Sequence, residues 1–184
     1  ALGKVLAGID RATRLVSQLL TLARLDHNPQ ALAGDAELVA LARQQLLDAS
    51  DDATARNVRC EWPDSLPNWP HPVNPALLDV LLRNLVDNAV RYTPAGGRVW
   101  LEDAGQGWLT LANDAPEALD AETLARLGER FFRPAGQSAS GSGLGLSIAR
   151  RAARLCGLEL SLSLREGVFR AHLRTSTTRL ASRG

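Results

Sequence analysis

The 184-residue sequence lacks features that define several classes of protein. It has only two cysteines, Cys60 and Cys156, in unrelated contexts without a CxxC pattern, which excludes a disulfide-rich scaffold and favours buried free thiols. No apolar run approaches the roughly 20 residues of a membrane span. The 21 Lys and Arg residues balance 20 Asp and Glu residues, so net charge draws the chain neither to nucleic acid nor to an anionic membrane. Because methionine is absent altogether, we expect a piece of a longer protein.

What is present is the composition of a globular domain, with 45% hydrophobic and 22% charged residues. We expect helices at 37–53, 75–92, 121–127 and 144–156, and strands at 58–62, 98–103, 107–113, 158–164 and 168–174. The Pro-rich passage 63–75 has room only for a short edge strand. This order predicts a two-layer α/β sandwich over 37–174, after a linker at 28–36 and before a polar tail at 175–184.

The first 27 residues carry apolar side chains at heptad spacing. The seam consists of Leu2, Leu6, Ile9, Thr13, Val16, Leu20 and Ala23. Such a seam predicts a long coiled-coil-type helix that needs partner helices, either from upstream or from a second copy of the chain. The alternative is a helix that lies on the chain's own globular domain.

Two amides and a guanidinium share one face of the helix expected at 75–92. Asn84, Asn88 and Arg91 are spaced i, i+4 and i+7, opposite a face that is almost solid leucine. An amide oxygen can ligate Mg²⁺, and a nearby cation can hold a phosphate. Taken alone, the pattern also fits ordinary solvent-facing residues.

A glycine-rich segment, GSGLGLS at 141–147, runs directly into the next expected helix. Glycines let the backbone approach an anion closely, and a helix N-terminus presents free N–H groups. No Lys follows the last glycine, so this is not a Walker loop, and no strand precedes it as in a dinucleotide fingerprint. By itself the segment fits a flexible turn equally well.

Two further features complete the set. The segment ERFFRP at 129–134 places adjacent aromatic residues between Arg130 and Arg133, which suits either phosphate contact or simple anchoring of a loop. Asp114 ends an expected strand, where a carboxylate could accept a hydrogen bond from an exocyclic amine such as that of adenine.

In this order and spacing, the four features resemble the catalytic, ATP-binding part of a bacterial sensor histidine kinase, closest in wording to the QseC and PmrB types. Residues 84–94, NLVDNAVRYTP, resemble the N box of that family, 129–134 its F box and 141–147 its G2 box. Residues 8–16 and 25–26 resemble the second helix of its dimerisation domain. The likeness covers roughly residues 2–174 and implies the Bergerat ATP-binding fold, shared with gyrase, Hsp90 and MutL.

The resemblance also implies roles for individual residues, with ATP and Mg²⁺ as ligands. Asn88 would ligate the Mg²⁺ with help from Asn84, Arg91 would contact phosphate, Tyr92 would line the pocket, and Asp114 would bind the adenine amine. Arg130 or Arg133 would meet the γ-phosphate side, beside a mobile lid at about 134–142. The phosphates would lie close to backbone amides of the segment containing Gly141, Gly143, Leu144, Gly145 and Leu146.

One position separates a kinase from the related ATPases. Those ATPases resemble one another in carrying a Glu four residues before the metal-binding Asn, where it activates water. Here that position is Asn84, and an amide cannot act as a general base. This favours transfer of the phosphoryl group to another nucleophile over hydrolysis.

Two departures from the family pattern are evident. The first glycine box of the family reads Asp-x-Gly-x-Gly, whereas this chain has DAPEA at 114–118, with Pro116 and Ala118 in place of glycines. None of His27, His71 and His172 begins the family's phosphoacceptor motif. We therefore expect the acceptor on a helix before Ala1, and no autophosphorylation by this chain alone.

The leading hypothesis is the cytoplasmic ATP-binding region of a bacterial inner-membrane sensor histidine kinase. It would form a homodimer through the N-terminal helix and pass phosphate through a histidine to an aspartate of a response regulator. Nucleic acid and direct membrane contact are not expected. The alternatives are a degenerate module that binds partners but no nucleotide, and an anti-sigma-type Ser/Thr kinase.

Overall fold

The computed structural model describes residues 34–103, 108–115, 120–129, 132 and 143–175, together with separate positions between 8 and 23. The helices are α2 (Leu38–Asp48), α3 (Ser50–Ala55), α4 (Pro75–Tyr92), α5 (Ala121–Arg126) and α6 (Gly145–Cys156). The strands are β1 (Ala36–Glu37), β2 (Arg59–Glu61), β3 (Pro70–His71), β4 (Arg98–Asp103), β5 (Trp108–Asp114), β6 (Leu158–Arg165) and β7 (Val168–Thr175).

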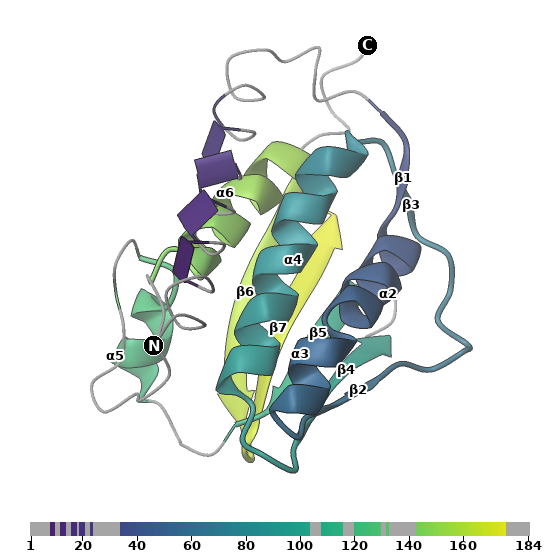
Figure 1. The fold of residues 1–184 in the computed structure, drawn as a ribbon. Helices are drawn as coiled ribbons and strands as arrows, with labels where there is room; N and C mark the ends of the chain where they lie inside the picture. The colour runs from purple at the N-terminus through teal and green to yellow at the C-terminus, as the bar shows by residue number, and fades with distance from the viewer. Residues whose placement is uncertain are drawn as a thin grey trace.

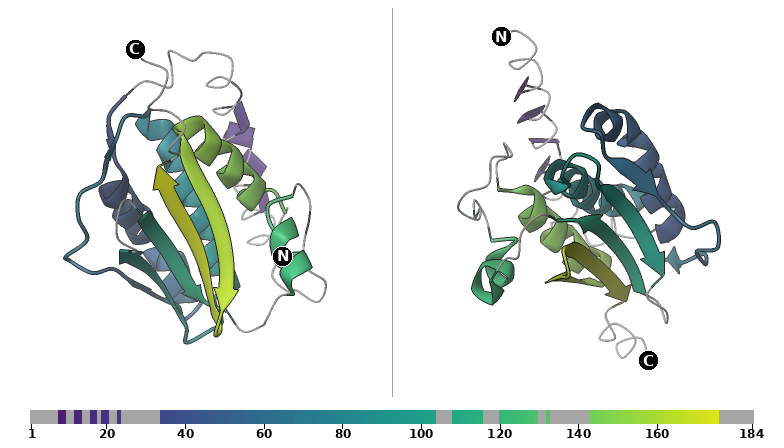
Figure 2. Two further views of the ribbon diagram at one scale, coloured as in Figure 1. Left: turned by 180° about the vertical axis from the view of Figure 1, so that it is seen from behind. Right: turned by 90° about the horizontal axis from the view of Figure 1, so that it is seen from below.

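Five strands form one sheet in the order β2-β4-β5-β7-β6, in which only the β2–β4 pair is parallel. Helices α2, α4 and α6 lie on one face of this sheet (Figure 1). Viewed from behind, the other face is covered by none of the described helices (Figure 2). The predicted two-layer α/β sandwich is confirmed.

Helix α4 is the central element of the helical layer, between α2 and α6 (Figure 1). It begins where predicted, because the side chain of Asn74 accepts a hydrogen bond from the backbone N–H of Ala76 at 2.9 Å and Pro75 occupies the first turn. The predicted leucine face is buried, and each fully buried leucine contributes about 1.5–3 kcal/mol through burial. This packing fixes the polar face of α4 relative to the sheet.

The helix predicted at 37–53 is instead two helices, α2 and α3, with a break at Ala49. Glu37 is the N-cap of α2, and its carboxylate accepts hydrogen bonds from the backbone N–H groups of Val39 and Ala40. After the break, Asp51 and Asp52 lie in the first turn of α3, where negative charge stabilises a new helix N-terminus.

The end of the predicted linker contains a short strand that the sequence did not indicate. This strand, β1, pairs antiparallel with β3 in a separate two-stranded sheet. The edge strand allowed for in the Pro-rich passage is therefore present. Neither cysteine forms a disulfide, as expected; Cys156 is buried, whereas Cys60 is only half-buried.

Most of the long helix predicted at 1–27 lies outside the described residues. The positions described there are helical, and Ile9, Val16, Leu19 and Leu20 have between 46% and 56% of their surface exposed. In the described part of the chain, no helix combines the length and the apolar character needed to cross a bilayer.

Candidate functional site

The polar face of α4 carries the two asparagines one turn apart. Asn84 is buried at 5% exposure, and its Nδ2 donates to the carbonyl oxygen of Val80 at 2.7 Å. Asn88 is half-buried, as are Arg91 and Tyr92 in the last turn of the same helix. The predicted i, i+4, i+7 relationship is therefore real, although Asn84 is more enclosed than a solvent-facing residue would be.

The start of α6 lies beside this polar face. Gly143 has a φ of +70°, a conformation that glycine adopts without strain, and Gly145 begins the helix. Among the described residues no side chain caps the first turn of α6. Its first N–H groups and the positive end of the helix dipole therefore remain available to an anion.

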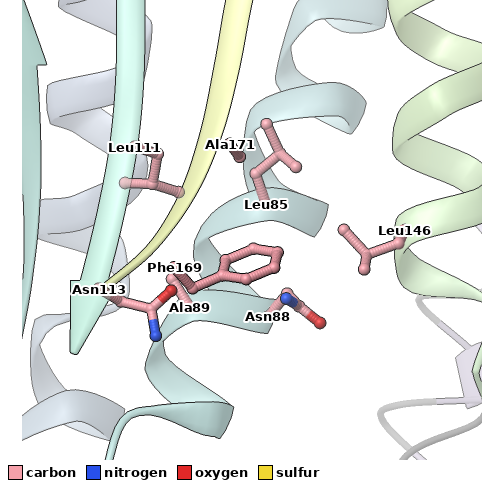
Figure 3. Close-up of a pocket in the computed structure, with 8 residues that line it drawn as sticks. All are labelled: Leu85, Asn88, Ala89, Leu111, Asn113, Leu146, Phe169 and Ala171. Atoms are coloured by element: carbon pink, nitrogen blue, oxygen red, sulfur yellow. The ribbon is translucent and has the colours of Figure 1, made fainter. Parts of the chain in front are cut away.

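A pocket opens between the sheet and the two helices α4 and α6 (Figure 3). Its walls are mainly apolar, and in this structure the lining side chains leave no room for a whole water molecule, so a ligand would have to displace them. The lining residues are Leu85, Asn88, Ala89, Leu111, Asn113, Leu146, Phe169 and Ala171. Asn88 and Leu146 connect this pocket to the α4 and α6 segments predicted to hold phosphate.

Asn113 is the one lining residue that contributes a polar side chain from the sheet, and the sequence analysis did not select it. It is only 2% exposed, and it lies on the same inward face of β5 as Leu109 and Leu111, at every second position of the strand. Its Nδ2 donates to the backbone carbonyl oxygen of Asp114 at 2.9 Å. Strand alternation was the available signal, because Leu109 and Leu111 already predict that residue 113 points inward.

Asp114, the residue selected for the adenine contact, lies outside the lining of this pocket. Its Oδ2 accepts a hydrogen bond from the backbone N–H of Arg98 at 2.9 Å, at the start of β4. The structure thus brings Asn113, and not Asp114, together with Asn88 and Leu146. The predicted contact of Asp114 with adenine stays a prediction.

Several predicted site residues lie outside the described residues: Arg130, Arg133, Gly141, Pro116, Ala118 and the lid segment. The chain that leads to the F box is described. Arg126 lies over the ring of Phe132 at 4.1 Å from its centroid and pairs with Glu129 at 3.3 Å. From α6, Arg150 donates to the carbonyl oxygen of Leu127 at 2.8 Å.

The polar groups at this site suit a metal ion that is bound together with a phosphate-containing ligand. Within the described ranges, no three His, Cys, Asp or Glu side chains gather into a metal site. The polar groups at the pocket are instead neutral amides from α4 and β5 and the uncapped first turn of α6. Amide oxygens can complete the octahedral shell of Mg²⁺ while phosphate oxygens supply its negative ligands, so these residues fit a Mg²⁺–nucleotide complex.

Comparison with known proteins gives the family. The family described as "Histidine kinase-, DNA gyrase B-, and HSP90-like ATPase" matches residues 73–178, more than half of the chain, and the chain belongs to it. Sensor protein QseC of Salmonella typhi is 42% identical over 177 residues, which cover 95% of this chain and 39% of the relative. Sensor protein kinase PmrB of Pseudomonas aeruginosa is 34% identical, over 83% of this chain and 32% of the relative. The chain thus spans about two fifths of the length of the QseC relative and about a third of the length of the PmrB relative.

Solved structures agree with this assignment. The cytoplasmic segment of histidine kinase QseC superposes with a TM-score of 0.63 at 30% identity, covering 91% of this chain and 93% of that one. Full-length ShkA in complex with AMPPNP shares the fold, with a TM-score of 0.66 at 22% identity over 91% of this chain and 36% of that one. The resemblance to sensor histidine kinases is confirmed, and neither the degenerate module nor the anti-sigma-type kinase is favoured.

Proposed function

We propose that this chain binds ATP with Mg²⁺ between α4, α6 and β5 and delivers the γ-phosphate to a histidine side chain. The observation that carries the proposal is the uncapped N-terminus of α6 beside the two asparagines of α4. A positive helix end opposite two amide groups suits a polyphosphate and its metal. Beyond them, the mainly apolar side chains that line the pocket suit contact with a base, which would have to move them apart to enter.

Each residue then has a part in holding the substrate. Asn88, with Asn84 beside it, would offer amide oxygen to the Mg²⁺, whose charge neutralises the phosphates. The backbone N–H groups of Gly145 and Leu146 would bind phosphate oxygens, with Arg91 and Tyr92 flanking from the last turn of α4. Positioning and charge neutralisation supply most of the catalysis in phosphoryl transfer. Arg130 and Arg133 are proposed to complete the γ-phosphate side.

Transfer is favoured over hydrolysis because of Asn84. The Nδ2 of Asn84 already donates a hydrogen bond to the carbonyl oxygen of Val80. The amide group also has no basic lone pair with which to take a proton from water. ATP bound beside Asn84 should therefore persist until a better nucleophile arrives. We expect phosphate release by the chain alone to be slow compared with transfer to an acceptor.

Neither described histidine is placed to be that acceptor. His71 is buried and its Nε2 lies 2.7 Å from the carbonyl oxygen of Cys156. Both ring nitrogens of His172 face hydroxyl groups, Thr110 Oγ1 at 2.8 Å and Ser163 Oγ at 3.0 Å, on the face of the sheet opposite the pocket. We propose that the acceptor belongs to another part of the kinase dimer, with onward transfer to a response-regulator aspartate.

The N-terminal residues support a proposed homodimer. The half-exposed Ile9, Val16 and Leu20 continue the heptad seam seen in the sequence, and such a seam is stabilised by a second helix. By analogy with the sensor-kinase relatives, the chain would belong to the cytoplasmic portion of a bacterial inner-membrane kinase.

Titration calorimetry with a non-hydrolysable ATP analogue tests the proposal. We expect Mg²⁺-dependent binding by the chain and its loss in Asn88→Ala. Asn68→Ala, which removes the same amide from an exposed loop, should bind as the parent does. Absence of binding to the parent chain, or equal binding by Asn88→Ala, would contradict the proposal and revive the degenerate module.

A further inference from the structure

We infer that Arg150 of α6 is a positioning residue, which holds the segment that leads into the F box (residues 129–134) against the helix proposed to bind phosphate. The inference rests on the proposed function, because it concerns how the γ-phosphate end of the same site is assembled. It assigns a role to a side chain that lies outside all of the sequence motifs.

Arg150 and the proposed phosphate-binding turn belong to the same helix. Arg150 lies four residues after Leu146 in α6, about one turn further along, and it is half-buried. Its Nη2 donates to the carbonyl oxygen of Leu127 at 2.8 Å. Leu127 is the C-cap of α5, so the guanidinium meets the negative end of that helix, where a cation is stabilising. One side chain of α6 therefore anchors the end of α5.

Gly128 allows the guanidinium to lie directly against the turn after α5. Its φ is +96°, and a Cβ atom there would overlap Nε of Arg150 and lie 2.7 Å from Cδ. The Nε atom is buried, and among the described residues it has no hydrogen-bond partner. An arginine free to point into solvent would not leave this donor unpaired, because burial without a partner costs free energy. The close packing and the hydrogen bond to Leu127 therefore hold the side chain in place.

Contacts continue from this turn into the F box. Arg126, the last residue of α5, places its guanidinium over the ring of Phe132, 4.1 Å from the centroid, and its Nε lies 3.3 Å from Oε2 of Glu129. The backbone N–H of Glu129 donates to the carbonyl oxygen of Arg126 at 2.9 Å, and that of Phe132 donates to the carbonyl oxygen of Glu129 at 3.3 Å. A continuous series of contacts thus places the start of the F box relative to α6.

This anchoring has a consequence for nucleotide preference. Arg130 and Arg133 are proposed to meet the γ-phosphate, and the F box that contains them begins at the anchored turn. Holding the turn in advance reduces the conformational entropy that is lost when a cation of the F box binds phosphate. ADP has no γ-phosphate and gains nothing from this pre-organisation. Arg150 should therefore strengthen the binding of ATP more than that of ADP.

Titration of two nucleotides into matched variants tests the assignment. The probes are the Mg²⁺ complexes of ADP and of a non-hydrolysable ATP analogue, titrated into the 184-residue chain. We expect the parent chain to bind the ATP analogue more tightly than ADP. Arg150→Met keeps an apolar side chain but lacks the donor, so it should reduce this preference about threefold to tenfold while the affinity for ADP stays as in the parent.

Arg154→Met is the matched control for charge. Arg154 is exposed and lies about one turn further along α6, so its substitution removes the same charge from the same helix. We expect it to leave the preference as in the parent. Arg150→Gln, which lacks both the charge and the reach to Leu127, provides a second variant if the methionine variant does not fold, and it should also reduce the preference.

A parent chain that binds both nucleotides equally would overturn the assignment, and so would an unchanged preference in the Arg150 variants. A reduction of equal size in Arg154→Met would also overturn it, as would a loss of affinity that is the same for both nucleotides, which is what a purely structural role predicts. In all of these cases the proposed function would stand, because nucleotide still binds. Failure of the parent chain to bind either nucleotide would instead overturn the proposed function, and the role of Arg150 with it.

Discussion

Gly145, the first residue of α6, lies against Asn84 of α4: a Cβ atom added at Gly145 would come 3.5 Å from the Oδ1 of Asn84. Apart from the chain neighbours of Gly145 and the backbone of α6 itself, the described residues place no other atom within 4 Å of this Cβ. Among the described residues, the space between the start of α6 and the buried amide of Asn84 therefore admits a small group without disturbing the core.

Gly145→Ala should separate stability from nucleotide binding. Contact at 3.5 Å is ordinary van der Waals contact, and alanine favours a helix, so we expect stability to be unchanged or higher by about 0.4–1 kcal/mol. The added methyl group would occupy the space proposed for phosphate. We expect roughly tenfold weaker binding of a Mg²⁺–ATP analogue, equivalent to the loss of about one charge-assisted hydrogen bond. Urea unfolding and calorimetry on the same sample measure both effects, and unchanged affinity would contradict the placement.

Gly128→Ala should destabilise the turn that precedes the F box. Gly128 has a φ of +96°, and a Cβ there would overlap Nε of Arg150 and lie 2.7 Å from its Cδ. Arg150 is held by the carbonyl oxygen of Leu127, which limits its freedom to move away. We expect a loss of about 1–2 kcal/mol from the φ alone, with an additional loss from the overlap, measured by urea unfolding.

Gly96→Ala is the matched control for this effect. Gly96 has a similar φ of +86°, but an added Cβ would meet nothing within 4 Å. The difference between the two variants isolates the contact with Arg150. Equal destabilisation of both would mean that Arg150 moves aside freely.

His172 should make the protein less stable as the pH falls. Burial lowers the pKa of His172 below its usual value, and the positive charge of Arg170 adds to this, while Glu102 acts in the opposite direction. The unfolded chain therefore takes up the proton more readily than the folded one. Stability should decrease as the pH falls below about 6.5 and level off below the lowered pKa of the folded state.

The measurement is the free energy of unfolding between about pH 8 and pH 5, compared with that of His172→Gln. The glutamine can still hydrogen bond toward Thr110 or Ser163 but does not titrate in this range. We expect a flatter profile for the variant. Parallel profiles would show that His172 titrates alike in both states.

Much of the fold was predictable because the local signals agreed with one another. Asn74 and Pro75 marked the start of α4, and the alternation of residues in β4, β5, β6 and β7 placed each strand to within about one residue at its ends. The break at Ala49 was not predicted, because the helical spacing continues across it. A two-residue strand such as β1 has no period from which it could be recognised.

The candidate site was predicted less completely, since it is assembled from elements distant in the sequence. The motif pattern pointed to Asp114 because this residue supplies a carboxylate at the end of the strand. Strand alternation places residue 113 on the inward face, but only the pairing of β5 with its neighbours, together with the position of α4, reveals that this part of the face lines the pocket. The enclosure of Asn84 likewise depends on how α4 packs, which helical spacing alone does not give.

Site-resolved NMR of the ¹⁵N-labelled chain, titrated with a Mg²⁺–ATP analogue, would locate the bound nucleotide residue by residue. We expect the largest shifts at the backbone amides of Gly145 and Leu146 and at the side-chain amides of Asn88 and Asn113. The indole N–H of Trp100, which donates to Glu102 at 2.7 Å, is the internal reference, because Trp100 alternates with the inward-facing Val99 and Leu101 on β4. Shifts centred on Trp100, with the first turn of α6 unmoved, would contradict a nucleotide site between α4, α6 and β5.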